Sequence, residues 1–167
     1  GPVTACGGDQ SEVVGMMGRS LELYSSRPQI TDKVSFVDDE GQYRVIRARA
    51  SNRQLVVLDV TVANRTSTIV PMMVDDEDAQ LGDRRGERIN ALDPFESSKP
   101  EEPPDPPDLE VDRYSPFLWG EIQLERNFQV GWWMVFDVPK GLTLGTIFWR
   151  DVDTITLDFI DYWPDRD

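Results

Sequence analysis

The chain of 167 residues contains no histidine, so it lacks the side chain that most often transfers protons near neutral pH and ligates zinc or copper. It also shows no nucleophile beside a plausible base and no glycine-rich phosphate loop. The familiar catalytic constellations cannot be assembled, and we do not expect an enzyme. Carboxylates brought together from distant loops, as in a carboxylate-dependent hydrolase, are the one catalytic arrangement left open.

Basic residues are scarce. Lys+Arg number 17 against 31 Asp+Glu, which gives a formal net charge of −14. Such a field repels phosphate backbones and anionic headgroups, so nucleic acid is not an expected partner. No uninterrupted apolar run approaches the roughly 20 residues that a membrane-spanning helix needs. We therefore expect any contact with a membrane to be through a lipid anchor.

Cysteine occurs once, at Cys6, so no internal disulfide can form. Residues 3–8, VTACGG, resemble a lipobox, in which small residues precede a cysteine that is lipidated after signal-peptide cleavage. We predict a lipid anchor at Cys6 within a leader and spacer that covers residues 1–29, where residues 13–24 hold one short strand or helix. The alternative is an ordinary cysteine in a disordered leader.

Extended segments with apolar alternation dominate the rest of the chain. The strongest is residues 54–64, QLVVLDVTVAN, where Val56, Leu58, Val60 and Val62 share one face that we expect in the core. Further strands are expected within residues 42–50, 69–74, 79–90 (a hairpin), 117–125, 128–138, 142–149 and 154–160. This pattern predicts an all-β fold, an immunoglobulin-like sandwich of two antiparallel sheets over residues 30–163, with residues 164–167 as a tail.

Residues 93–116 interrupt these strands with a segment that contains SSKPEEPPDPPD. The segment is too poor in apolar residues and too rich in proline to pack, so we predict a long, exposed, Pro/Glu-rich acidic loop. It is an insertion and not a domain boundary, because a sandwich that ended before residue 93 would lack half of its strands.

Three pieces of sequence occur in order: residues 55–66, a strand that passes through Asn64; residues 78–86, a Leu-turn-Gly hairpin; and residues 131–141, which contain Phe-x-Val-Pro. Together they resemble an immunoglobulin-like family of unknown function, frequent in extracytoplasmic lipoproteins of bacteria and archaea and similar in fold to a secreted mycobacterial immunogenic protein. The resemblance implies the fold and an extracytoplasmic location, and it brings no catalytic residues. The long insertion and the many tryptophans depart from the family.

The acidic run Asp75, Asp76, Glu77 and Asp78 offers several hard oxygens of the kind that Ca²⁺ prefers. The run lacks the spacing of an EF-hand loop, and acidic turns on so negative a protein are ordinarily solvated surface. The cofactor expectation is therefore none, with Ca²⁺ at this run as the alternative.

The tryptophans are candidates for a binding surface, because indole offers a large flat face with one hydrogen-bond donor. Trp132 and Trp133 are adjacent in a strand and must point to opposite faces. Either one of them lies in the core while the other meets a partner, or the sheet has a core on both sides. We predict Trp132, Trp133 and Trp163 as interface residues.

Residues 64–66, Asn-Arg-Thr, match the acceptor pattern for N-glycosylation. The pattern is short, and the same residue types suit a tight turn between strands. We favour the turn.

These observations favour a non-enzymatic interaction module of the cell envelope: an extracytoplasmic lipoprotein, anchored by lipid or secreted, that contacts another protein. One alternative is an accessory structural subunit of a membrane protein complex, with residues 93–116 and 161–167 extended along its neighbours. Another is a calcium- or small-ligand-binding domain.

Overall fold

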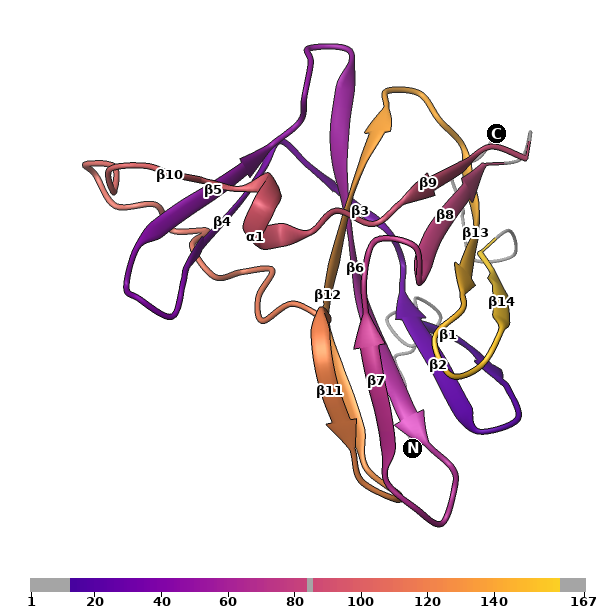
Figure 1. The fold of residues 1–167 in the computed structure, drawn as a ribbon. Coiled ribbons are helices and arrows are strands. Elements are labelled where there is room, and N and C mark those ends of the chain that lie inside the picture. Colours follow the sequence, from indigo (N-terminus) through magenta and orange to yellow (C-terminus); the bar gives the residue numbers. More distant parts are fainter. Residues whose placement is uncertain (1–12, 84–85, 160–167) are drawn as a thin grey trace, which may run out of the picture.

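The computed structural model describes residues 13–83 and 86–159, and almost all of its regular structure is β-strand arranged in antiparallel sheets (Figure 1). The all-β prediction is confirmed. Helix within the described residues is limited to one turn, α1 (Pro94–Ser97). None of the described helical structure is long and apolar enough to span a bilayer.

The central sheet is built around the longest strand, β6 (Arg53–Asn64). On one side, β12 (Gln129–Pro139) pairs with β6 along nearly its whole length. On the other side, β2 (Leu21–Ser26) and β3 (Gln29–Thr31) pair with successive parts of β6, and β1 (Val13–Met17) adds a further strand beyond β2.

Two sheets cover one face of the central sheet. One contains β7 (Val70–Val74) and β11 (Gly120–Leu124), and the other has the order β14 (Ile155–Asp158), β13 (Leu144–Trp149), β8 (Ala79–Asp83) and β9 (Arg88–Asn90). The main core lies between these layers. The four side chains predicted to share a buried face all point into it: Val56, Leu58, Val60 and Val62.

The opposite face of β6 packs against a side sheet of β4 (Lys33–Val37), β5 (Tyr43–Arg47) and β10 (Lys99–Pro100), which Figure 1 shows on the left. Leu55 and Val57 of β6 join Phe36 and Ile46 of the side sheet in a second cluster, the side core. The first half of β6 is therefore buried on both faces, which explains why residues 55–58, LVVL, show no polar alternation.

The predicted spacer over residues 1–29 is wrong from Val13 onward, because β1 and β2 belong to the central sheet. The one short strand or helix expected within residues 13–24 is two paired strands. Leu21 and Leu23 are fully buried and alternate with partly exposed residues. This period-2 signal spans only six residues, and the neighbouring glycines and serines obscure it. Residues 1–12, with Cys6, lie outside the described residues, so the anchor stays a prediction.

The prediction that residues 93–116 would not pack is also wrong at both ends of the segment. β10 pairs with β5, and Ser98 and Tyr114 are buried. Most of the residues between them are exposed, as expected. The error arose because the side chains that fasten this segment are mainly polar, and a hydropathy pattern does not count them.

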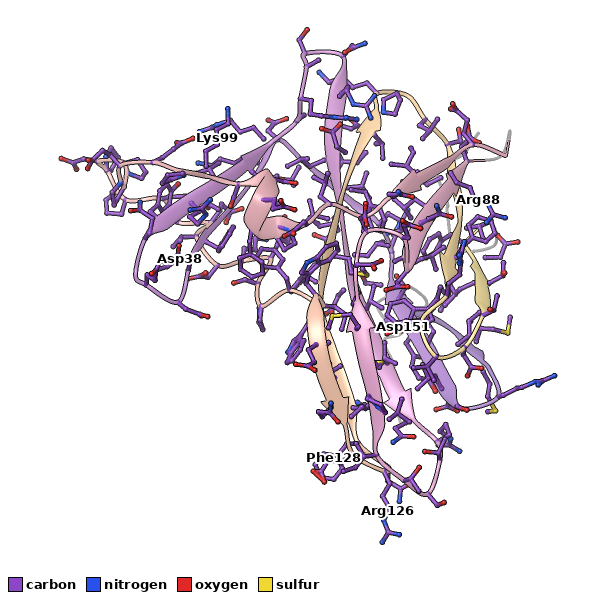
Figure 2. The ribbon with its side chains drawn as sticks, viewed as in Figure 1. Asp38, Arg88, Lys99, Arg126, Phe128 and Asp151 are labelled. Carbon is purple, nitrogen blue, oxygen red and sulfur yellow. The ribbon has the colours of Figure 1, made fainter. Side chains whose placement is uncertain are left out.

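Asn64 confirms the favoured turn. Its side-chain amide nitrogen donates to the carbonyl oxygens of Thr68 (2.8 Å) and Leu124 (2.9 Å), and its Oδ1 accepts from the backbone of Thr66. These bonds tie the β6–β7 turn to the β11–β12 turn, where Figure 2 shows Arg126 and Phe128. Because Asn64 is 1% exposed and its amide nitrogen is occupied, the folded chain cannot present it for glycosylation.

Candidate functional site

A groove of about 580 Å³ opens where the β7–β11 sheet meets α1. Its walls come from three separate parts of the chain: the end of β7 and the turn after it, the segment that leads into α1, and the start of β11. The residues that line it include Met73, Val74, Asp75, Asp76, Ala91, Leu92, Asp93, Glu96, Ser97, Trp119 and Gly120. We define this set as the α1 groove.

The wall that contains α1 is fixed at both ends. Asp93 caps the helix, since its Oδ1 accepts from the backbone N–H groups of Phe95 (2.9 Å) and Glu96 (3.3 Å), and Pro94 begins the turn. At the other end, Arg44 donates to the carbonyl oxygen of Ser98 (2.9 Å) and to its hydroxyl (2.8 Å). The Arg44 guanidinium thereby bonds a carbonyl oxygen at the end of α1 that has no donor within the helix.

Aromatic side chains support the same wall from behind. Phe36, Phe95 and Phe117 form an edge-to-face trio with centroid separations between 4.9 and 6.0 Å. Trp119 is half-buried and packs against both the main core and the side core. The apolar part of the groove lining combines Trp119 with Met73, Val74, Ala91 and Leu92.

The rim of the groove is acidic. Asp75, Asp76, Asp93 and Glu96 all line it, and none forms an ion pair with a described basic residue. By contrast, the partly exposed Glu101 has Arg47 at 3.2 Å. Carboxylates that share a concave surface without counter-charges concentrate a negative potential there, which attracts cations.

A second group of carboxylates lies beside β7, next to the groove. Burial raises the pKa of Asp78 to about 6, and the carboxylates of Asp75 and Asp151 add to the shift. Burial also raises the pKa of Asp151, whose Oδ2 accepts from the backbone N–H of Met73 at 3.0 Å (Figure 2). Protonation near pH 6 would reduce the negative charge at this end of the groove.

The predicted acidic run is thus split by the structure. Asp75 and Asp76 line the groove, Glu77 is exposed, and Asp78 turns inward to accept from the backbone N–H of Asp75 at 2.9 Å. No group of three or more Asp, Glu, His or Cys side chains among the residues described here is placed to hold a metal ion. The calcium site stays a prediction.

The predicted tryptophan interface is placed only in part. Trp132 packs on the main core and Trp133 on the side core, and both are half-buried, which matches the alternative of a core on each side of the sheet. Trp133 also meets Tyr114 edge-to-face at 5.1 Å. Trp163 lies outside the described residues. A role at an interface remains a prediction for all three.

The sequence analysis missed Asp93, Glu96 and the use of Trp119 in the groove. A local signal for the first two exists, because Asp93-Pro94 followed by Glu96 is a helix-start pattern. It was overlooked inside a segment judged too polar to fold. Nothing in the sequence brings residues 75, 96 and 119 together, since their meeting depends on how three sheets pack.

No protein-family model and no curated protein sequence matches the chain. Among solved structures, the crystal structure of "a putative lipoprotein (ycdA)" from Bacillus subtilis subsp. subtilis str. 168 matches with a TM-score of 0.48 and 14% sequence identity. The match covers 87% of this chain and 38% of that chain, so this chain spans well under half of the protein it matches.

Proposed function

We propose that this protein is a non-enzymatic interaction module of the cell envelope, an immunoglobulin-like lipoprotein domain whose α1 groove binds a cationic segment of a partner protein. The observation that carries the proposal is the groove itself, which is lined by four carboxylates without counter-charges and by Trp119. The packing of antiparallel sheets around the main core supports the immunoglobulin-like assignment.

The chemistry of the groove favours an arginine or lysine side chain of the partner. The aliphatic stem of such a side chain covers apolar surface while its charged end stays at the rim. An indole face adds a cation–π attraction, and Asp76 and Glu96 are free to accept charge-assisted hydrogen bonds. A fixed wall keeps the entropy cost of binding low, because little of the site needs to be ordered.

The test is site-specific photo-crosslinking in cells that produce the protein. A photo-reactive phenylalanine analogue replaces Ser97 in the groove in one variant and the exposed Thr156 of β14 in another, so that all four rim carboxylates are kept. We expect one discrete protein adduct from position 97 and none of that mass from position 156. The absence of an adduct at position 97, or the same adduct from both positions, contradicts the proposal.

A charge-matched pair of variants tests whether the rim carboxylates are responsible for binding of the partner. The double substitution Asp76→Asn with Glu96→Gln removes two charges from the rim, and Asp39→Asn with Glu40→Gln removes two from the exposed β4–β5 turn. Both leave the same net charge, so a general effect of charge is equal in the two. We expect the adduct at a crosslinker placed at Ser97 to fall about tenfold only with the rim variant, as the loss of one charged contact implies.

A second candidate, an accessory subunit of a membrane complex, is favoured by Leu109. This side chain is 92% exposed at the end of a segment that the neighbouring Asp108 fastens to the side sheet. A rigidly presented, fully exposed leucine resembles an anchor for a pocket on a partner. Co-purification of a membrane complex that is lost with Leu109→Ser and retained with the groove variant would favour this function.

A further inference from the structure

The two outer edges of the β7–β11 sheet differ in whether they can pair with another strand. Along β7, Pro71 has no backbone N–H, and the N–H of Met73 already donates to Asp151. Proline and a covering side chain are standard ways to keep an edge strand from pairing with another chain. The β7 edge is therefore closed.

The β11 edge is open. The N–H of Met73 points away from β11, so Met73 and Glu121 form a non-hydrogen-bonded pair of the ladder. Such pairs alternate with hydrogen-bonded pairs along an antiparallel ladder, so Pro71 and Gln123 are also a non-hydrogen-bonded pair. The backbone N–H and C=O groups of Glu121 and Gln123 must then point outward from the sheet. No described residue supplies a partner for these groups.

Of the usual protective devices, β11 has only its short length and the charge of Glu121. The strand contains no proline and no lysine, and its pairing with β7 has no bulge. Ile122 and Leu124 are buried in the main core, while Glu121 and Gln123 are exposed. An added strand would meet an edge without a bulge, whose side-chain register is fixed by the core.

We propose that β11 accepts an additional strand from a basic, extended segment of a partner protein. Main-chain hydrogen bonds to Glu121 and Gln123 would give affinity, and the exposed carboxylates of Glu121 and Glu125 select a cationic segment. The net charge of −14 disfavours pairing with a second copy of the same chain.

The β11 edge is continuous with the α1 groove, since β11 begins at Gly120, which with Trp119 lines that groove. A segment that follows the β11 edge would therefore reach the groove at the start of the strand. The choice of a protein partner rests on the proposed function, whereas the open edge stands on its own geometry.

The experiment uses a synthetic peptide of alternating lysine and valine with blocked ends, and the complete protein. Hydrogen exchange of the backbone amides is followed with and without the peptide. We expect the amides of Glu121 and Gln123 to gain protection while that of the already bonded Met73 changes little. A peptide with N-methylated backbone nitrogens on its pairing edge is the control, because it keeps the charge and loses the donors.

Gln123→Pro is the matched variant of the protein. It removes an outward N–H in the same row in which Pro71 is already accommodated, so the ladder with β7 loses no bond. We expect about tenfold weaker peptide binding for Gln123→Pro at an unchanged melting temperature, and unchanged binding for Gln123→Ala. Should Gln123→Pro prove unstable, the N-methylated peptide alone decides.

Three outcomes overturn the proposal: no protection at Glu121 and Gln123, equal binding of the N-methylated peptide, or sedimentation that shows self-pairing through β11. These outcomes are separable from failure of the groove. If only the groove binds, the crosslink at position 97 falls with the rim variant and the peptide gives no protection along β11. Protection along β11 with no crosslink at position 97 leaves strand addition standing and refutes the groove.

Discussion

The two faces of the β6–β12 ladder are covered by layers of different chemistry. The main core, on one face, is closed by sheets whose inward side chains are almost all aliphatic or aromatic. The side core, on the other face, is smaller, and its covering layer is fastened by two buried carboxylates, Asp108 and Asp137. One layer is held mainly by burial of apolar surface, and the other depends on ion pairs and hydrogen bonds as well.

Asp137 shows how a polar contact fixes the side layer. It is 1% exposed at the end of β12, and its carboxylate accepts from Arg53 Nε at 2.5 Å and from both the backbone N–H (2.9 Å) and Nε (3.3 Å) of Arg49. These bonds secure the β5–β6 connection. A buried carboxylate with several donors is satisfied, and removal of its charge leaves Arg49 and Arg53 without their counter-charge and takes away one of the two acceptor oxygens.

Asp108 has the same role for the Pro/Glu-rich segment. Its Oδ2 accepts from Ser35 Oγ at 2.5 Å and from the Tyr43 hydroxyl at 2.7 Å, and Lys33 Nζ lies 3.4 Å away. The hydrogen bonds from Ser35 and Tyr43 hold the pKa of Asp108 well below its ordinary value, while burial raises the pKa of Tyr43. One carboxylate thus helps to order a segment that is poor in apolar residues. The comparison teaches that low hydropathy does not imply the absence of packing.

The largest expected effect comes from two leucines on the same strand. Leu58 points into the main core and Leu55 into the side core, and both are fully buried. We expect Leu58→Ala to lower the free energy of unfolding by about 4 kcal/mol, because a cavity between two sheets cannot collapse. Leu55→Ala should cost about 2 kcal/mol, since the side core is small and Phe95 at its edge is half exposed. Urea unfolding measures both, and equal losses would contradict the comparison.

A smaller loss is expected from Asp137→Asn, which keeps the shape of the side chain and removes the charge. We expect about 2 kcal/mol of destabilisation, because Arg53 is only 23% exposed and loses its buried counter-charge. Asp59→Asn is the control. Burial raises the pKa of Asp59, so removal of its charge should be neutral or stabilising. Thermal unfolding of the two variants at pH 7 should therefore shift in opposite directions or leave Asp59→Asn unchanged.

The part of the fold that the sequence predicted is the part whose strands alternate around the main core. The face shared by Val56, Leu58, Val60 and Val62 identifies β6, and strands β7, β8, β9 and β11 to β14 fall within predicted segments, apart from one residue at the end of β12. β4 was missed because the alternation of residues 33–36, KVSF, is short and ends at Val37, and because it does not match the burial: Ser35 is buried and Val37 is exposed. Apolar alternation detects a strand that has one buried face and one solvent-exposed face. The strands β4 and β5 of the side sheet do not have this simple pattern of burial.

The candidate site was predicted even less well, for a related reason. Asp75 and Asp76 were singled out as a local run, yet their partners in the groove are Glu96 and Trp119, from distant segments. A single sequence reports neighbours along the chain and the period of each strand. It does not report that the end of β7 faces α1, because this depends on the packing of the sheets.

Asp108→Asn should cost about 1.5 kcal/mol at pH 7, within the range for hydrogen bonds to a charged group. The folded pKa of Asp108 is lowered from 3.8, so its stabilising contribution is present above pH 4 and is lost as the pH falls further. The gap between wild type and variant should therefore be constant from pH 5 to 8 and narrow below about pH 4. Asp105→Asn, exposed in the same segment, is the control. A gap that does not narrow at all as the pH falls from 5 to 3 would show that the charge of Asp108 is not what orders the segment.

The smallest effect is expected at Asp78, beside the main core, and it has the opposite sign. Its folded pKa of about 6 lies above the ordinary 3.8, so the folded state favours the protonated carboxyl, and this stabilisation is lost as the pH rises through 6. Asp78→Asn removes the charge but keeps an oxygen to accept from the N–H of Asp75. We expect the variant to be more stable than wild type at pH 8, by ~1 kcal/mol after allowance for solvent screening, and equal to it below about pH 4. Melting temperatures across this range measure the difference, with the exposed Asp76→Asn as control. A stabilisation that does not change with pH would mean that ionisation of Asp78 does not destabilise the folded state.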